Sequence, residues 1–198
     1  MNNLTGTISE NLNLYDGCPP ICLNYQTIWG EKMHRIVEDI FEQDLDTVPS
    51  YVDPCSLEWV SANRVCQLKY KQVIKSTSVE ESIKWAGGST GEWTIRADII
   101  GTVLGNTAII DIKATKNLNM KAARAQLSAY AYALMQRDNI STPLLYVLHL
   151  PMNGLGKLKR VPIMDYKELL DFLQNNQVEG VECWEGSNWI PSSDHKIW

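Results

Sequence analysis

The chain has 198 residues, enough for one domain with a sizeable apolar core. Its apolar fraction of 44% is ordinary for a globular protein, and no segment reaches the roughly 18 uninterrupted apolar residues that a membrane-spanning helix needs. The net charge of −5 argues against a protein that coats nucleic acid with a broad basic surface. This net charge is compatible with an enzyme that contacts phosphate through a bound cation.

The chain is expected to form a single domain over residues 1–198, with a core of about 25–175 and an unassigned tail, 176–198. Its N-terminus has neither the basic start nor the apolar run of a secretory signal. We therefore expect a cytoplasmic protein, in the host cytoplasm if a phage encodes it.

Two helices are predicted in the N-terminal third. Residues 1–23 look irregular, whereas residues 24–43 repeat apolar side chains every three or four positions, which indicates an amphipathic helix. Asp53 followed by proline is a typical helix start, so a second helix is expected to run from there to about Tyr70.

Strands dominate the middle of the chain. Residues 77–85 suggest a first strand, and a glycine-rich loop at 86–92 follows it. The segments 93–104 and 107–115 are rich in β-branched residues, and only Gly105-Asn106 separates them. Two such segments around a two-residue linker predict a tight hairpin.

The last third returns to alternating helices and strands. Residues 119–137 are alanine-rich and predict a helix, and 144–150 is a continuous apolar run typical of a buried strand. A further strand is expected at 157–163, and Asp165 is expected to cap a helix that ends near Asn175. The predicted order indicates a mixed α/β fold.

The hairpin places charged side chains in register. If Gly105-Asn106 forms the turn, Asp98 lies opposite Lys113, and Asp111 lies opposite Ile100, one diagonal step from Asp98. Side chains alternate between the faces of a strand, so the two acids and the lysine point to one face. Diagonal neighbours lie about 7–8 Å apart at Cα, close enough for two carboxylates to share a metal ion.

This pattern is suited to phosphodiester hydrolysis. Asp98, Asp111 and the backbone carbonyl of Ile112 offer the hard oxygen ligands that Mg²⁺ or Mn²⁺ takes. Lys113 is placed to orient a metal-bound water or to stabilise charge in the transition state. The alternative interpretation is a surface hairpin with an ordinary Asp–Lys cross-strand pair.

Two of the predicted helices carry polar side chains at four-residue spacing, which places those side chains on one helix face. Gly30, His34 and Glu38 recur at four-residue spacing, so a metal-ligating nitrogen and a third carboxylate follow a glycine that permits close backbone approach. Gln126 and Tyr130 recur in the same way on the later helix, where the glutamine can reach a phosphate. Taken alone, the first pair is also typical of a surface contact, and Tyr130 of an apolar helix face.

Four segments together resemble the PD-(D/E)XK nuclease superfamily, in particular its RecB-like exonuclease branch. They are GEKMHRIVE at 30–38, IRADIIG at 95–101, IIDIKAT at 109–115 and QLSAY at 126–130, and they occur in the order of that family. The resemblance spans roughly residues 25–150. It implies a restriction-endonuclease-like core, in which helices flank a mixed β-sheet.

The resemblance also implies roles for individual residues. Asp98 and Asp111 match the metal-binding carboxylates, and Lys113 matches the catalytic lysine. His34 matches the helix histidine that completes the metal shell, with Glu38 as an additional candidate ligand. The late motif, which organises the site and the DNA, supplies two more candidates, Gln126 and Tyr130.

Several positions depart from the family pattern. Arg96 stands where relatives often have glycine, and the acid that some relatives carry on the preceding strand has only Glu80 or Glu81 as loose candidates. Some relatives hold an iron–sulfur cluster through one early and three late cysteines. This chain lacks the late three, so no cluster is predicted; its cysteines are Cys18, Cys22, Cys55, Cys66 and Cys183.

The leading hypothesis is a Mg²⁺- or Mn²⁺-dependent DNA exonuclease of recombination or repair, as in phages. DNA binding is expected to involve Lys116, Lys121 and Arg124, which lie in a stretch without acids. A recombination or single-strand-annealing protein is a candidate partner, an oligomer is compatible with the sequence, and no membrane association is expected. The alternatives are a non-cutting relative that binds nucleic acid or protein, and a structure-specific endonuclease.

Overall fold

The computed structural model describes residues 2–3, 8, 20–86 and 92–174. They contain a six-stranded sheet in the order β1-β3-β4-β5-β6, with β2 paired to β3. The pairs β1–β3 and β4–β5 are parallel, and the other neighbours are antiparallel. The strands are β1 (Asn2–Asn3), β2 (Ile74–Ala86), β3 (Glu92–Val103), β4 (Asn106–Lys113), β5 (Leu144–His149) and β6 (Lys157–Val161).

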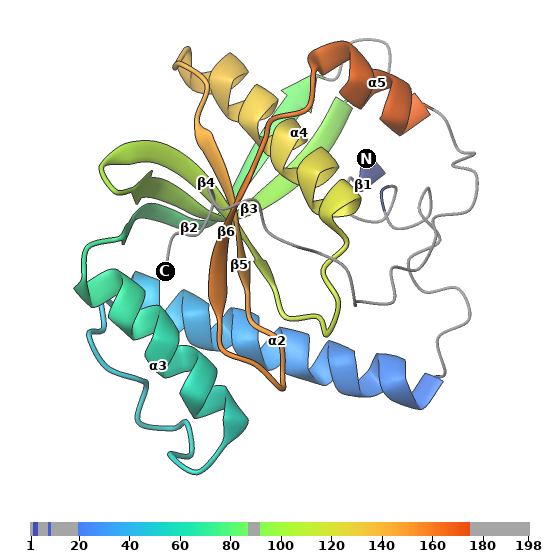
Figure 1. Ribbon diagram of the computed structural model, residues 1–198. Helices are drawn as coiled ribbons and strands as arrows, with labels where there is room; N and C mark the ends of the chain where they lie inside the picture. The colour runs from blue at the N-terminus through green and yellow to red at the C-terminus, as the bar shows by residue number, and fades with distance from the viewer. Residues whose placement is uncertain (1, 4–7, 9–19, 87–91, 175–198) are drawn as a thin grey trace.

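Helices cover both faces of this sheet (Figure 1). One side carries α2 (Pro20–Glu42) and α3 (Leu57–Tyr70), and the other carries α4 (Met120–Asp138) and α5 (Tyr166–Gln174). Each side has its own apolar core, one centred on α2 and one on α4. The predicted mixed α/β fold is therefore confirmed. Among the helices of the described segments, none has the length and apolar character needed to cross a membrane.

The α4 side of the sheet is packed with small side chains. Along α4, Ala122, Ala125 and Ala129 face the core, which lets the helix lie close to the strands. Asn119 caps the helix by accepting a hydrogen bond from the Ala122 amide at 3.0 Å. This close packing also fixes the position of two predicted site residues on the same helix, Gln126 and Tyr130.

Most predicted elements are present, with corrections at their ends. The first helix begins at Pro20 rather than at residue 24. The second begins at Leu57, because Ser56 is its N-cap and Asp53 instead caps the turn before it. Asp165 caps α5 as predicted, with its carboxylate accepting from the amides of the helix start. The short strand β1 was not predicted, and Trp184, Trp189, Trp198, Cys18 and Cys183 lie outside the described residues.

The predicted hairpin forms, but its turn is displaced by one residue. Leu104 and Gly105 occupy the turn, with φ of 50° and 80°, and Val103 pairs with Asn106. Positive φ at both positions is the hairpin geometry that matches the twist of the strands. Leu104 is held there by its amide, which donates to the Val73 carbonyl at 2.9 Å.

The displaced turn changes the pairing of the two strands. Ile99 pairs with Ile110, so continuing the register sets Asp98 opposite Asp111 and not opposite Lys113. Alternation in β3 is interrupted near Asp98, because Ala97 and Ile100 both pack into the core on the α4 side while Ile99 packs on the α2 side.

Gly101 in β3 is a position where the fold has no room for a side chain. A Cβ there would lie 1.9 Å from the Lys75 carbonyl oxygen, beside the irregular pairing of β2. We predict that Gly101→Ala lowers the free energy of unfolding in urea by about 1–3 kcal/mol. Gly30→Ala is the control, because its Cβ would meet no atom within 4 Å and helix propensity should raise stability by about 0.5–1 kcal/mol. Equal stabilities for Gly101→Ala and the wild type would contradict the packing described here.

Candidate functional site

The site lies where β3 and β4 separate. Their backbone pairing ends at Ile99 and Ile110, and beyond it the carboxylate of Asp98 makes the contact between the two strands. The Ile112 amide donates to Asp98 Oδ2 at 2.6 Å. Asp98 is 8% exposed and Asp111 only 1% exposed, so two carboxylates are buried at this point of the sheet, and the charge of Asp111 acts on Asp98.

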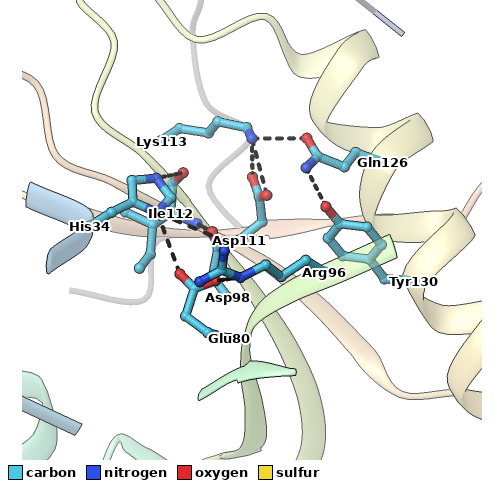
Figure 2. Close-up of polar contacts among 9 residues, drawn as sticks. All are labelled: His34, Glu80, Arg96, Asp98, Asp111, Ile112, Lys113, Gln126 and Tyr130. Carbon is cyan, nitrogen blue, oxygen red and sulfur yellow. Dashed lines mark hydrogen bonds and ion pairs between the residues drawn. The ribbon is translucent and has the colours of Figure 1, made fainter. Parts of the chain in front are cut away.

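Asp111 leads to a chain of polar contacts that ends on α4 (Figure 2). Lys113 Nζ lies 3.0 and 2.8 Å from the two carboxylate oxygens of Asp111. The same ammonium donates to Gln126 Oε1 at 2.8 Å, and Gln126 Nε2 donates to the Tyr130 hydroxyl at 2.5 Å. Gln126 and Tyr130 are both buried, so α4 fixes the position of the lysine.

A second group gathers around Asp98 from the α2 side. His34, Glu80 and Asp98 each present a ligand atom, and these atoms lie within 4.8 Å of one another. His34 Nδ1 is 3.9 Å from Glu80 and 4.0 Å from Asp98. Its other ring nitrogen, Nε2, lies 3.1 Å from the carbonyl oxygen of Ile112. The histidine therefore meets three of the groups able to bind a metal ion.

Glu80 was only a loose candidate in the sequence, and the structure places it in this group. It lies between the pairs Val79–Ile99 and Glu81–Ala97, which sets it opposite Asp98. Its φ of 53° is unusual for a strand residue, so the backbone is strained where the carboxylate enters the site. The other acid considered, Glu81, turns away and contacts Ser78 and Arg137.

Arg96 also contacts this group. It departs from the family glycine, and its guanidinium forms an ion pair with Glu80. The arginine side chain is 62% exposed, so it links the buried acids to the surface. Relatives that have glycine at this position could not form this ion pair, and the sequence pattern did not predict it.

Three groups of the site, Asp98, His34 and Glu80, have shifted pKa values. Burial, followed by the charge of Asp111, raises the pKa of Asp98 to about 7. Burial lowers the pKa of His34, but Glu80 and the charges of Asp98 and Asp111 outweigh it and leave that pKa above its ordinary value. The pKa of Glu80 is lowered, chiefly by its interaction with His34.

These donors fit a divalent metal ion. Carboxylate and carbonyl oxygens with one imidazole suit Mg²⁺ or Mn²⁺, and a cation between two buried acids would relieve their repulsion. The predicted ligands His34, Asp98 and Ile112 lie close together, whereas the carboxylate of Asp111 faces Lys113. Glu38 is not part of the close group, although burial and the charge of Glu80 raise its pKa.

The predicted DNA-binding residues lie in different settings. Lys116 is exposed in the loop before α4, and Lys121 lies over the ring of Phe172 with Nζ 5.7 Å from its centroid. Arg124 is engaged within the protein: its guanidinium donates to the carbonyls of Pro162 and Ile163 and to the Glu168 carboxylate. This arginine holds α4 to α5.

Known structures share this fold at low identity. No protein-family model matches the chain, and no curated protein matches its sequence. The crystal structure of SSO0001 is similar with a TM-score of 0.51 and 12% identity, over 88% of this chain and 74% of that one. The "Putative exonuclease" from Eubacterium rectale is similar with a TM-score of 0.49 and 13% identity, over 73% of this chain. The match spans 63% of that exonuclease's length.

The raised pKa of Asp98 predicts how stability depends on pH without metal. Folded protein holds a proton on this carboxyl between its ordinary pKa of 3.8 and about 7, and unfolded protein releases it. The free energy of unfolding in EDTA should therefore fall as pH rises through this window. His34, whose pKa is also raised, adds a further fall above about pH 6.5.

We predict that Asp98→Asn reduces the loss of stability between about pH 5 and about pH 8 by more than about 1 kcal/mol, measured by urea unfolding. Asp171→Asn, on the exposed side of α5, should keep the wild-type dependence. A pH dependence in Asp98→Asn as steep as in the wild type would show that Asp98 is ionised in the folded protein.

Proposed function

We propose that this chain is a metal-dependent nuclease with a PD-(D/E)XK core that hydrolyses phosphodiester bonds. One observation carries the proposal: two buried carboxylates, Asp98 and Asp111, lie together beside Lys113 at the point where two strands part. A structural ion pair would use one acid for one lysine. A second buried acid beside the pair is costly unless a cation joins the site.

The proposed ion is Mg²⁺ or Mn²⁺. Asp98, Asp111 and the Ile112 carbonyl would hold it, with His34 and Glu80 as the other candidate ligands. When bound, such an ion polarises a phosphoryl oxygen and lowers the pKa of a coordinated water. Within the protein, the Ile112 amide keeps Asp98 oriented through the hydrogen bond at 2.6 Å.

Lys113 would supply the positive charge at the reacting phosphate. Its side chain is 24% exposed, so the ammonium is reachable from solvent while Asp111 beneath it is buried. Gln126 accepts from the ammonium and Tyr130 accepts from Gln126, so the lysine is held in one position before substrate arrives. A fixed ammonium can orient the attacking water or stabilise the charge that develops on phosphorus-bound oxygens.

The proposed substrate is DNA, and the proposed activity is that of an exonuclease in recombination or repair. The four-motif resemblance supports this choice, together with the placement of all four motifs around one site (Figure 2). A recombination or single-strand-annealing protein remains the proposed partner. Cutting from ends distinguishes this activity from that of an endonuclease.

Cleavage assays test the proposal directly. Purified protein should degrade end-bearing DNA with Mg²⁺ or Mn²⁺ and leave covalently closed circles intact. Asp111→Asn and Lys113→Ala should each lower the rate by at least about 100-fold, because each removes transition-state stabilisation. Lys71→Ala, an exposed lysine near the hairpin turn, should cut at the wild-type rate. DNA binding without cleavage under either metal would instead favour a non-cutting relative, and cut circles would favour an endonuclease.

Metal binding can be measured without any substrate. Mn²⁺ at about 100 times its dissociation constant should raise the melting temperature of the wild type by roughly 5–10 °C, because binding to the folded state alone stabilises it. Asp98→Asn should lose most of this rise. Glu81→Gln, which removes an acid on β2 that points away from the site, should retain it. An equal rise in Asp98→Asn would place the ion elsewhere.

A further inference from the structure

A row of basic side chains continues from the proposed site across the sheet. In the parallel pair β4–β5, Lys113 is the register partner of His149, and in the pair β5–β6, His149 is the partner of Lys157. The neighbouring row runs from Asp111 through Val147 to Lys159. Two lysines of β6 therefore lie in the same rows as the acid and the lysine of the site.

These side chains point to the same side of the sheet. Leu158 packs into the core on the α2 side, and Val161 packs into the core on the α4 side. Because strand residues alternate, Lys157 and Lys159 project to the α4 side with Val161. Val147, the partner of Lys159, also packs on that side. Lys113 reaches Gln126 of α4, so it lies on this side as well.

The spacing of the rows suits a nucleic-acid backbone. Adjacent strands lie about 4.8 Å apart, so two strand spacings separate Lys113 from Lys157 by roughly 10 Å. This distance corresponds to about three nucleotide steps at the 3.4 Å rise of one DNA strand. A phosphate held at β6 would therefore belong to the same molecule as a phosphate at Lys113.

Among the described residues, this part of the sheet gathers three basic side chains, Lys157, Lys159 and His149. Burial and the charge of Lys157 lower the pKa of Lys159. Burial lowers the pKa of His149, and Lys159 and Lys157 lower it further, while its Nε2 lies 2.8 Å from the Thr115 carbonyl oxygen. Within the described part of the chain, no acidic side chain forms an ion pair with Lys157. An anion placed here would relieve the repulsion between these cations.

We propose that Lys157 and Lys159 bind backbone phosphates of the nucleic-acid strand whose scissile bond lies at Asp98, Asp111 and Lys113. This inference rests on the proposed nuclease function and extends its substrate site to β6. It also replaces Arg124 in the predicted DNA-binding set, since the guanidinium of Arg124 is occupied by Glu168 and two backbone carbonyls. The two residues are called the β6 lysines below.

Lysines on an edge strand can serve another purpose, because they discourage pairing with other chains, and β6 ends the path of strands from β1. That purpose needs charge but no particular ligand. It predicts aggregation when the lysines are removed, and no change in how nucleic-acid binding responds to salt. The salt dependence therefore separates the two roles.

The test measures binding of the full chain to a short fluorescein-labelled single-stranded oligodeoxynucleotide, by anisotropy, with Ca²⁺ in place of Mg²⁺. For the double variant Lys157→Ala/Lys159→Ala, the slope of log affinity against log salt should flatten by about 1.4, since each lost single-strand phosphate contact removes about 0.7. The ratio of wild-type affinity to variant affinity should then fall about sevenfold as the salt concentration rises from roughly 50 to 200 mM. The same measurement with double-stranded DNA should flatten the slope by about 1.8 if the protein binds the duplex.

The matched control removes two exposed lysines at the other end of the sheet, Lys71→Ala/Lys75→Ala, and should keep the wild-type slope. The variant Lys157→Arg/Lys159→Arg should restore the slope, because it restores the charge. In Mg²⁺, the alanine pair should raise KM for end-bearing DNA at least about fivefold with kcat within about twofold, because it removes binding common to ground and transition states.

The outcomes separate this inference from the proposed function. A wild type that cuts DNA, with an unchanged salt slope in the alanine pair, would overturn the role of the β6 lysines and leave the nuclease intact. A wild type that binds through these lysines but cuts nothing would overturn the nuclease and support the binding role. Equal flattening in the control pair would overturn the binding role, because binding would then follow net charge alone.

Discussion

Two carboxylates buried side by side are the constraint on which the rest of this structure depends. The interior of a protein stabilises an ionised acid poorly, and a second acid beside it adds repulsion. Lys113 offsets part of the charge of Asp111. Burial and the charge of Asp111 raise the pKa of Asp98 to about 7, so this carboxyl takes up a proton near neutral pH. A site that must take up a proton or a cation to be stable is well prepared to bind a divalent ion.

The fold supplies this arrangement by separating two strands. Where pairing between β3 and β4 ends, the Asp98 carboxylate accepts a hydrogen bond from the Ile112 amide. α2 brings His34 from one side, and α4 brings Gln126 from the other. The proposed ligands thus sit on helices and strands, and the β6 lysines lie in the neighbouring rows of the same sheet.

Patterns with a strict period were predictable from the sequence, and features set by three-dimensional packing were not. The two strands of the hairpin and its two-residue turn were predictable, although the turn was assigned one residue too late. Glu80 enters the site through a positive φ, which no local pattern signals. Arg124 looked available for DNA, but tertiary contacts with Glu168 occupy it. Conversely, Lys159 comes into line with Asp111 only through strand pairing over long sequence separation.

Anomalous diffraction from crystals grown with Mn²⁺ tests the central claim most directly, because it locates the ion without any assay of activity. The account predicts one strong manganese peak bound by Asp98 and Asp111, with the Ile112 carbonyl oxygen among its ligands and Lys113 still hydrogen-bonded to Gln126. A manganese-containing crystal in which this position is empty, with Asp111 bound only to Lys113, would contradict it.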